Sequence, residues 1–271
     1  MPLVSPGSSA ARRAPRFTPM AIEAISPATQ SGVGAVAVDL RIPSDQAERF
    51  AYRAGQYVTM RTSVPGPDGP TDVRRSYSLV GSPAWSAQTG LLRIASREIP
   101  DGLMSTWLNR HAHPGDVVGV AEPLGELTVD PYTPDEAMLG FIVAGSGITP
   151  AMSILTEGLH EMERRGFVVL VGSRSRATSM FRSELLELAD NYAWRMFLAE
   201  AFSREPGDTE ALSGRLDRER IDELLHVFAD TRVHTWFTCG PESLVVDARA
   251  ALEAFGVAPD RIKTEVFDEG V

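Results

Sequence analysis

The stretch MLGFIVAGSGITP, residues 138–150, decides the fold of the second half of this 271-residue chain. Its uninterrupted apolar run predicts a β-strand buried on both faces, and the glycines that follow lead into a helical stretch. The same cycle recurs along the chain. We expect further strands at 167–173, 194–203, 234–241 and 261–267, and amphipathic helices at 150–166, 179–189, 217–229 and 242–256. Apolar strands that alternate with amphipathic helices predict a parallel sheet with helices on both faces.

The first half of the chain has a different periodicity. Short β-type segments are predicted at 34–42, 56–62, 74–80, 91–98 and 117–122. Polar and Gly/Pro clusters such as residues 64–72 separate them, and one helix is expected from near Ser105 through residues 106–112. Several short strands at this spacing predict a closed or nearly closed antiparallel β-barrel.

These two patterns predict a chain of two domains. We expect a disordered tail at 1–16, a β-barrel domain at 17–130 and a Rossmann-like α/β domain at 137–271. A polar link, DPYTPDE at 130–136, joins the domains. A chain of this length accommodates two cores of ordinary domain size.

Composition and charge exclude several classes of protein. The sequence contains no run of about 18 apolar residues, so it predicts no membrane-spanning helix. The first sixteen residues lack the apolar stretch of a secretory signal, so we expect no membrane partner and a cytoplasmic location. Basic and acidic side chains balance up to residue 130, and the net charge of −10 arises from the remainder. This charge argues against a nucleic-acid partner.

Cys239 is the single cysteine of the sequence. An internal disulfide is therefore excluded, which fits a reducing compartment. A complete iron–sulfur site within these residues is excluded as well, because such clusters need several thiolate ligands. His111 and His113 stand two positions apart on a predicted helix and point to different faces, so we expect no metal site.

The turn Gly145-Ser146-Gly147-Ile148-Thr149-Pro150 follows the first strand of the predicted parallel sheet. Glycines allow a pyrophosphate to approach the backbone, and the N-terminus of a helix offers free N–H groups to an anion. An ordinary tight strand-to-helix turn is an equally good interpretation. Strand two ends in Gly172-Ser173-Arg174, with Arg176 and Arg182 nearby, which fits a 2′-phosphate or else a solvated arginine cluster.

Two weaker motifs lie in the predicted barrel. In Arg75-Ser76-Tyr77-Ser78 the arginine and the aromatic ring share one face of a strand, where they could hold a phosphate and stack on a planar heterocycle. Exposed cross-strand pairing explains this motif as well. Gly102-Leu103-Met104-Ser105 begins a helix with Ser105 as the expected N-cap, which predicts a second anion site, although most such caps bind nothing.

The last motif, Cys239-Gly240-Pro241, closes a strand at the edge of the parallel sheet where ligands bind. A buried cysteine acting as a small hydrophobe is the alternative interpretation. Glu265 and Phe267 lie on the last predicted strand, where they either end a half-buried strand or reach across to a bound flavin.

Taken together, these motifs resemble the ferredoxin–NADP⁺ reductase superfamily, in which a flavin-binding antiparallel barrel precedes a nicotinamide-dinucleotide domain. The resemblance extends from about Pro15 to Phe267 and rests on the order and approximate spacing of the four motifs. Segments 172–174, 180–182, 202–205 and 213–216 further resemble the reductase components of bacterial oxygenases, notably the phenylacetyl-CoA epoxidase reductase type.

The resemblance implies a role for each motif. In the barrel it implies that Tyr77 stacks on the isoalloxazine of FAD, that Ser78 lies near flavin N5 and that Arg75 binds the flavin phosphate. The FAD pyrophosphate is expected on the backbone of Gly102, Leu103, Met104 and Ser105. The remaining expected residues bind NADP or NAD: Gly145, Gly147 and Thr149 at the pyrophosphate, Ser173, Arg174, Arg182, Ser203 and Arg204 at the adenosine end, and Cys239, Gly240 and Pro241 at the nicotinamide. Glu265 is expected to tune the flavin's proton balance and Phe267 to reach the flavin.

The implied function is a flavin-dependent oxidoreductase that passes electrons from NAD(P)H through FAD to a ferredoxin or an oxygenase component. The relatives usually carry an additional [2Fe–2S] domain, whereas this sequence stops at Val271 without the necessary cysteines. We therefore expect either a truncated sequence or a separate electron acceptor. A flavin reductase that acts on free flavin or small acceptors, and a non-catalytic flavin or nucleotide sensor, are the alternatives.

Overall fold

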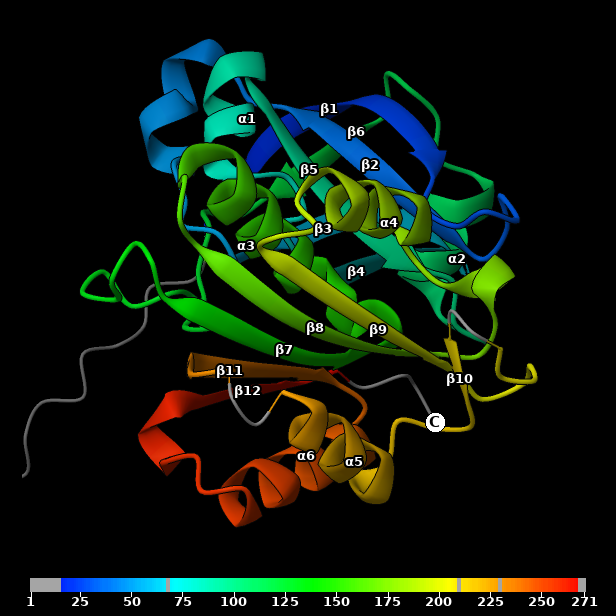
Figure 1. Ribbon diagram of the computed structural model, residues 1–271. Coiled ribbons are helices and arrows are strands. Elements are labelled where there is room, and N and C mark those ends of the chain that lie inside the picture. Colours follow the sequence, from blue (N-terminus) through cyan, green and yellow to red (C-terminus); the bar gives the residue numbers. More distant parts are fainter. Residues whose placement is uncertain (1–15, 67–68, 209–210, 229–230, 268–271) are drawn as a thin grey trace, which may run out of the picture.

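The structure is a computed structural model that describes residues 16–66, 69–208, 211–228 and 231–267. It has two sheets, one from each half of the chain (Figure 1). The first sheet is antiparallel, in the order β4-β3-β6-β1-β2-β5. Its strands are β1 (Thr18–Pro27), β2 (Ala35–Arg41), β3 (Tyr57–Gly66), β4 (Gly69–Ser78), β5 (Leu91–Arg97) and β6 (Val117–Val120).

The first sheet curls into a nearly closed barrel, as predicted. Its two edge strands, β4 and β5, approach each other through a bridge between Leu79 and Ile94, and Val80 N donates to Arg93 O at 2.8 Å. Inward-facing apolar residues such as Val58 and Leu92 are fully buried in the barrel core. On either side of the bridge the edges of β4 and β5 diverge, so the barrel stays open along part of its length.

The second sheet is parallel, in the order β10-β9-β8-β7-β11-β12. Its central strands β7, β8 and β11 are buried on both faces, because helices α3 and α4 cover one face and α5 and α6 the other (Figure 1). This is the predicted α/β architecture. Its strands are β7 (Met138–Ala144), β8 (Gly166–Ser173), β9 (Met196–Phe202), β10 (Ala211–Ser213), β11 (Val233–Gly240) and β12 (Ile262–Val266).

The helices belong to three groups. The barrel carries α1 (Pro83–Thr89) and α2 (Leu103–Arg110), and the parallel sheet carries α3 (Ile148–Glu161), α4 (Arg182–Asn191), α5 (Arg218–Val227) and α6 (Glu242–Ala254). Short 3₁₀ helices span Ser44–Phe50, Gly145–Gly147, Arg176–Thr178 and Pro259–Arg261. Within the described residues, no helix has both the length and the apolar character needed to cross a membrane.

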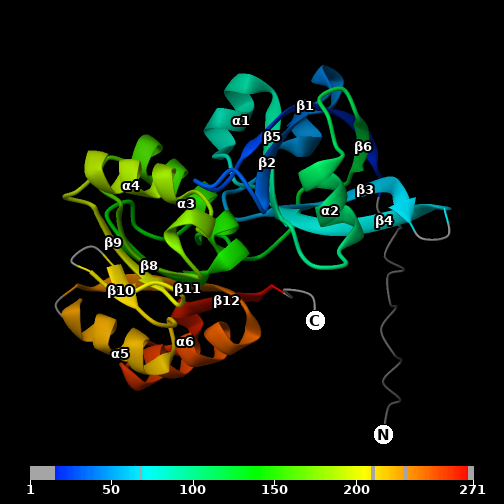
Figure 2. The ribbon, with the colours of Figure 1, turned by 90° about the vertical axis from the view of Figure 1, so that its right-hand side faces the viewer.

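Several contacts join the two domains. The carbonyl of Gly81 in the barrel accepts hydrogen bonds from Tyr52 Oη at 2.8 Å and from Ser153 Oγ of α3 at 2.6 Å. Lys263 Nζ on β12 donates to Thr128 O at 2.6 Å. The hydrophobic core beneath α3 also includes barrel residues such as Ala95. Helix α3, which follows β7, is therefore packed directly against the barrel (Figure 2).

The structure corrects four expectations about secondary structure. Strand β1 and the short strand β10 were missed, and residues 64–66 and 69–72 belong to β3 and β4 rather than to a loop. The barrel also carries α1, which has the usual sequence signals: Ser82 accepts a bond from Trp85 N, and Gly90 ends the helix at a φ of 67°. Of the disordered tail expected at 1–16, residues 1–15 lie outside the described residues.

Candidate functional site

A cavity of about 690 Å³ lies between the barrel and the parallel sheet, and we name it the interdomain cavity. The barrel side consists of β4, β5 and the start of α2, and the opposite side comes from the turn after β7 and from the end of the chain. The cavity is lined by Tyr57, Arg75, Ser76, Tyr77, Ser78, Ala95, Ser96, Arg97, Ile99, Gly102, Met104, Ser105, Ser146, Thr149, Glu265, Val266 and Phe267. The volume falls within the range of ordinary ligand sites.

The barrel side of this cavity is made from strand edges. In the first sheet β4 pairs with β3 and β5 pairs with β2, so each strand presents its other edge to the gap in the barrel. Backbone N–H and C=O groups along such an edge are available to a ligand. This explains why the four residues from Arg75 to Ser78 line the cavity together, although alternate side chains point to opposite faces.

Helix α2 starts at the same gap. Its N-cap is Gly102, not Ser105 as predicted. The Ser105 side chain lies within the helix, where Oγ donates to Gly102 O at 3.1 Å and accepts from Ile99 N at 3.3 Å. A Cβ at position 102 would lie 2.4 Å from Ser105 Oγ and 2.5 Å from Ile99 Cγ1. The absence of a side chain there lets Ser105 and Ile99 pack against the helix N-terminus, whose dipole favours an anion.

Tyr77 supplies an aromatic ring to the interdomain cavity. Burial raises the pKa of its hydroxyl to about 12. The ring is therefore neutral at physiological pH, as a stacking partner for a planar heterocycle requires. Arg75, the neighbouring cation on this strand, is exposed and donates Nη1 to Arg74 O at 2.7 Å. These strand-edge, helix-terminal, aromatic and cationic groups together fit an FAD molecule.

The turn after β7 contributes to the interdomain cavity in a way the sequence did not predict. Thr149 is buried, donates Oγ1 to Ser146 O at 2.8 Å, and lines this cavity together with Ser146. Gly147 lines neither this cavity nor the next one. A Cβ on Gly147 would lie 2.1 Å from Cys239 O. The expected pyrophosphate role of Gly147 is thus replaced by a packing role, because the start of α3 touches the backbone of β11.

The Cys239-Gly240-Pro241 motif lies at the end of β11. Cys239 is 1% exposed and belongs to the hydrophobic core under α3, and it lines neither cavity. Burial, and secondly the charge of Glu265, raise the pKa of its thiol. Its burial agrees with the small-hydrophobe interpretation, and its expected place at the nicotinamide stays a prediction. Gly240 has a φ of 147°, and Pro241 lines the second cavity described below.

The last strand, β12, delivers two side chains to the interdomain cavity. Its register places Glu265 beside Cys239, and Phe267 N donates to Gly240 O at 2.9 Å. Glu265 and Phe267 both line the cavity, opposite the barrel residues. Burial raises the pKa of the Glu265 carboxyl. The end of the described chain therefore forms one wall of the same cavity as Tyr77.

A second cavity, of about 500 Å³, lies at the carboxyl ends of the parallel strands, and we name it the strand-end cavity. Open parallel sheets bind ligands at this edge. It is lined by Arg97, Ala144, Gly145, Gly172, Ser173, Arg174, Ser203, Arg204, Arg215, Leu216, Asp217, Pro241, Ser243, Leu244 and Asp247. Gly145, Ser173, Arg174, Ser203 and Arg204 were expected to bind the dinucleotide, and the structure brings them together here.

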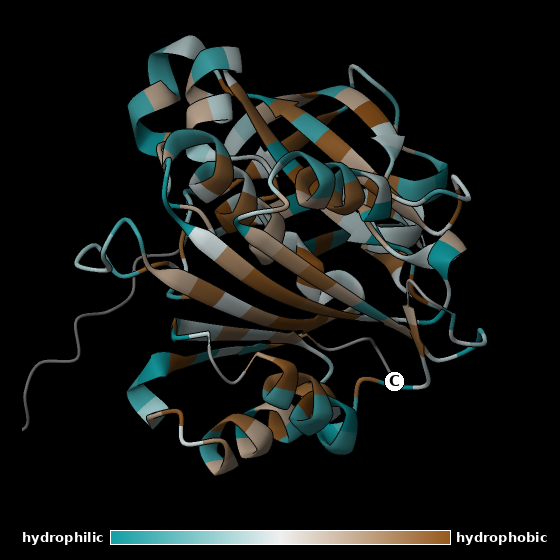
Figure 3. Ribbon diagram, viewed as in Figure 1, coloured by the Kyte–Doolittle hydropathy of each residue, from teal (hydrophilic) through white to brown (hydrophobic). Residues whose placement is uncertain are grey.

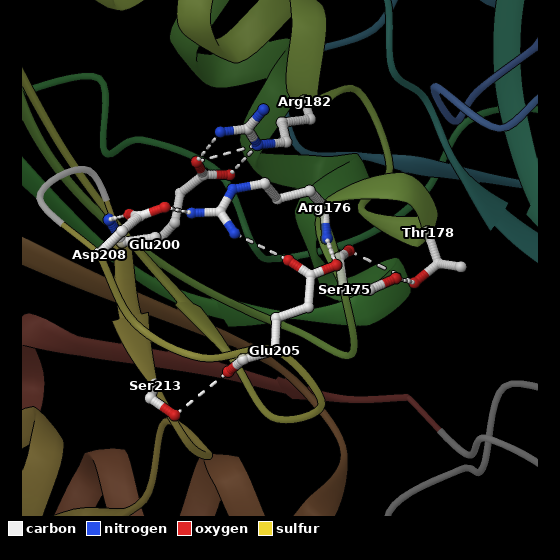
Figure 4. Close-up of polar contacts among 9 residues, drawn as sticks. Ser175, Arg176, Thr178, Arg182, Glu200, Glu205, Asp208 and Ser213 are labelled. Atoms are coloured by element: carbon white, nitrogen blue, oxygen red, sulfur yellow. Dashed lines mark hydrogen bonds and ion pairs between the residues drawn. The ribbon is translucent and has the colours of Figure 1, made fainter.

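The arginines near the strand-end cavity divide into two groups. Arg174, Arg204 and Arg215 line the cavity, and their side chains form no hydrogen bond or ion pair with any residue in the described ranges. Arg176 instead pairs with Glu205 at 2.8 Å and with Asp208 at 2.5 Å (Figure 4).

Arg182 corrects a prediction, because it does not line the strand-end cavity. Its side chain is 9% exposed and forms a bidentate ion pair with Glu200, which is buried on β9, at 2.9–3.0 Å (Figure 4). The guanidinium also lies 5.7 Å from the ring of Phe202. Such a pair is already satisfied within the protein, so Arg182 supports β9 instead of binding a nucleotide.

Arg97 and Arg215 were both missed as site residues. Among the described residues, Arg97 alone lines both cavities, and it is the barrel's one contribution to the strand-end cavity. Its strand was predicted, but its place at the junction depends on how the domains pack, which sequence periodicity does not report. Arg215 lies on the segment Ser213-Gly214-Arg215-Leu216. This segment was noted for its resemblance to the oxygenase reductases, but none of its residues was assigned a role.

Comparison with known proteins identifies both halves of the chain. The oxidoreductase FAD-binding domain family matches residues 33–129, and the oxidoreductase NAD-binding domain family matches residues 141–250. The chain is 31% identical over 235 residues to a component of the 1,2-phenylacetyl-CoA epoxidase of Escherichia coli (strain K12), covering 86% of this chain and 64% of that protein. It is also 31% identical over 228 residues to the ferredoxin reductase component of 3-ketosteroid-9-alpha-monooxygenase of Rhodococcus rhodochrous, covering 84% and 59%. The chain thus spans about three fifths of the length of these relatives.

A solved structure shares the whole fold. The ferredoxin NADP⁺ reductase from Neisseria gonorrhoeae with bound FAD and NADP superposes with a TM-score of 0.72 at 21% identity, covering 93% of this chain and 98% of that chain. At this identity the likeness establishes the fold. The site has to be argued from the residues themselves.

Proposed function

Because this chain belongs to the ferredoxin–NADP⁺ reductase superfamily and carries its FAD-binding and NAD-binding oxidoreductase domains, we propose that it takes electrons from NADPH onto FAD and passes them singly to a ferredoxin or an oxygenase component. The observation that carries this proposal is the interdomain cavity, which is lined by the barrel motif on one side and by the parallel-sheet domain on the other. Two cofactors can meet only where both domains contribute.

We place the functional boundary in the segment 130–136. On this division residues 17–130 hold FAD, and residues 137–267 hold the nicotinamide dinucleotide. The family matches at 33–129 and 141–250 lie on either side of the segment. The first sheet ends at Val120 and the second begins at Met138, so no strand crosses the proposed boundary.

The barrel residues are assigned to FAD. Tyr77 stacks on the isoalloxazine, Ser78 lies by flavin N5, and Arg75 neutralises phosphate charge. The helix start from Gly102 to Ser105 receives the pyrophosphate. The support for these roles is that all of them except Leu103 line the interdomain cavity. Leu103 instead packs against the barrel core.

When bound, FAD supplies the conversion of a two-electron hydride transfer into single-electron steps. The protein's part is alignment: the residues of the interdomain cavity would hold the flavin and nicotinamide rings close together, which accounts for a large share of the rate. Tyr77 and Phe267 line opposite sides of the interdomain cavity, so they confine the rings and exclude water. Glu265, whose pKa is raised by burial, can hold a proton near the flavin.

We assign NADPH rather than NADH to the strand-end cavity. A 2′-phosphate brings about two negative charges, and the cavity lining offers Arg174, Arg204 and Arg215 without an ion-pair partner in the described part of the chain. Ser203 lines the same cavity and adds a hydroxyl donor, whereas the Ser173 hydroxyl already donates to Ser179 Oγ at 3.0 Å. Three uncompensated guanidinium groups favour the more highly charged nucleotide.

The purified protein tests this function directly. We expect a yellow protein that contains about one FAD per chain, is bleached by NADPH, and reduces a [2Fe–2S] ferredoxin faster than free FMN. NADPH oxidation with free FMN exceeding that with ferredoxin would favour the flavin-reductase alternative. A colourless protein that neither binds added FAD nor oxidises NADPH would refute the proposal.

A further inference from the structure

A third cavity, of about 320 Å³, lies between the domains and is built from elements other than the strand ends. We name it the α1–α4 cavity, because α1 and β5 of the barrel and α3 and α4 of the parallel-sheet domain surround it. None of its lining residues lines the interdomain or the strand-end cavity. In Figure 2 helices α1, α3 and α4 lie together, on the opposite side of the barrel from α2.

Aromatic and aliphatic side chains form much of this cavity. Trp85 comes from α1, Met152 from α3, and Leu188 from α4, with Phe181 and Tyr192 at the two ends of α4. Phe181 and Leu188 are buried, and the Trp85 and Tyr192 rings are partly exposed. A cavity of this size and lining accommodates a ligand with one or two aromatic rings.

Arg93 lines the cavity as well, and its charge is already compensated. It forms a bidentate pair with the buried Asp39, with Nε–Oδ1 at 2.6 Å and Nη2–Oδ2 at 2.8 Å. Its guanidinium also lies 4.7 Å from the centre of the Trp85 ring. The Arg93–Asp39 pair therefore brings no net charge to the cavity.

Two carboxylates of the cavity lack a hydrogen-bonded ion-pair partner such as Asp39 provides for Arg93. Glu184 and Glu187, three residues apart on α4, line the cavity, and neither forms a hydrogen bond or an ion pair with any residue that the structure describes. The hydrogen bond to Asp39 is the largest cause that raises the pKa of Arg93, and the charge of Glu184 is the smallest. The lining therefore combines aromatic rings and the His160 imidazole with two hydrogen-bond acceptors that carry negative charge.

We propose that the α1–α4 cavity binds a small organic cation whose body is one or two aromatic rings and whose ammonium group pairs with Glu184 and Glu187. The rings remove apolar surface from water, and the ammonium satisfies both carboxylates. An anionic ligand of the same shape would be repelled, and a neutral one would leave the carboxylates unpaired. This site is independent of the proposed reductase function.

Calorimetric titration of the FAD-loaded protein with three naphthalene probes tests the proposal. We expect 1-naphthylmethylammonium to bind at least tenfold more tightly than 1-naphthalenemethanol, and 1-naphthoate not to bind. The double variant E184Q/E187Q should weaken binding of the ammonium probe at least tenfold. Both side chains are exposed on the helix, so the variant is expected to fold. E219Q is the matched control, because Glu219 is also an exposed first-turn glutamate, on α5, and should leave binding unchanged.

Saturating NADP⁺ separates this site from the strand-end cavity. The ammonium probe should bind with the same affinity in its presence, since the two cavities share no residue. Equal affinities for the three probes, full affinity in E184Q/E187Q, an equal loss in E219Q, or displacement by NADP⁺ would each overturn the proposal.

Discussion

The interdomain cavity and the strand-end cavity solve the same problem, the binding of a phosphate-bearing cofactor, with different parts of the chain. The barrel side of the first uses open strand edges and the helix start at Gly102. The second uses side-chain charge, from Arg174, Arg204 and Arg215. A backbone-built site tolerates little change in shape, whereas a charge-built site can be adjusted one residue at a time.

Charge near the strand-end cavity is itself divided. Arg176 and Arg182 are held by acidic partners (Figure 4), while Arg174, Arg204 and Arg215 have none among the described residues. Hydropathy along β8 and β9 is high up to this edge, so the charged groups gather where the strands end (Figure 3). The paired arginines stabilise the fold, and the unpaired ones are available to a ligand. Substitutions in each group should therefore have different signatures.

The largest effect is expected from Arg182→Ala. This change leaves the buried Glu200 carboxylate without its partner, which typically costs about 3–5 kcal/mol of unfolding free energy. Urea unfolding followed by circular dichroism measures it. Replacing both partners, as Arg182→Met with Glu200→Leu, should restore most of the loss. A loss of unfolding free energy below about 1 kcal/mol is typical of a solvated ion pair. It would mean that the Arg182 side chain is available to bind a nucleotide.

If the helix start at Gly102 binds the FAD pyrophosphate through its backbone, adding one methyl group there should weaken FAD binding strongly. In Gly102→Ala the new Cβ would overlap Ser105 Oγ and the Ile99 side chain and displace the start of α2. We expect FAD affinity to fall about 100-fold, the size of losing one or two charge-assisted hydrogen bonds. Flavin fluorescence on titration with FAD measures it.

Ser82→Ala is the control, because it removes the N-cap of α1 in the same domain. It should cost about 1 kcal/mol of stability and leave FAD affinity unchanged. Equal FAD affinity in Gly102→Ala and the wild type would show that the pyrophosphate lies elsewhere.

The order of strands and helices in the second half could largely be predicted from the sequence, because β7 and β8 are apolar over nearly their whole length and the helices between the strands are amphipathic. Strand β1 was missed although TPMAIEAISP alternates over part of its length, with Met20 and Ile22 buried. α1 was missed because its seven residues are fewer than a periodicity test needs, although its capping residues were visible. For α1, the capping residues Ser82 and Gly90 were a better indication of a helix than its periodicity.

The site was predicted by segment more successfully than by residue. The motifs gave the correct turns and strand ends, but spacing does not tell which member of a motif is buried. Gly147 and Cys239 touch each other across the α3–β11 junction, and Arg182 meets Glu200, eighteen residues away, through the packing of α4 on β9. Arg97 was missed for the same reason, because its position depends on two domains at once.

Arg174→Ala tests the charge-built cavity and should change nucleotide preference rather than stability. Losing one charge-assisted contact to the 2′-phosphate should raise KM for NADPH about 10- to 100-fold and leave KM for NADH within about threefold. Steady-state kinetics with both nucleotides measure it. Arg176→Ala is the matched control: its partners are Glu205 and Asp208, so any change should be equal for the two nucleotides. Equal effects of Arg174→Ala on NADPH and NADH would contradict the assignment.

The smallest effect concerns Glu265, through which a titratable carboxyl enters the interdomain cavity. Burial raises its pKa, so the folded protein binds the proton more tightly than the unfolded chain does. Between the unfolded pKa and the raised folded pKa, stability therefore falls as the pH rises. Glu265→Gln removes this dependence: its unfolding free energy should match the wild type near pH 4 and exceed it above neutral pH. Urea unfolding across that range measures the difference. If the unfolding free energies of the variant and the wild type changed in parallel with pH, the Glu265 carboxyl would be as well solvated as in the unfolded chain. Another group would then have to hold a proton in the cavity.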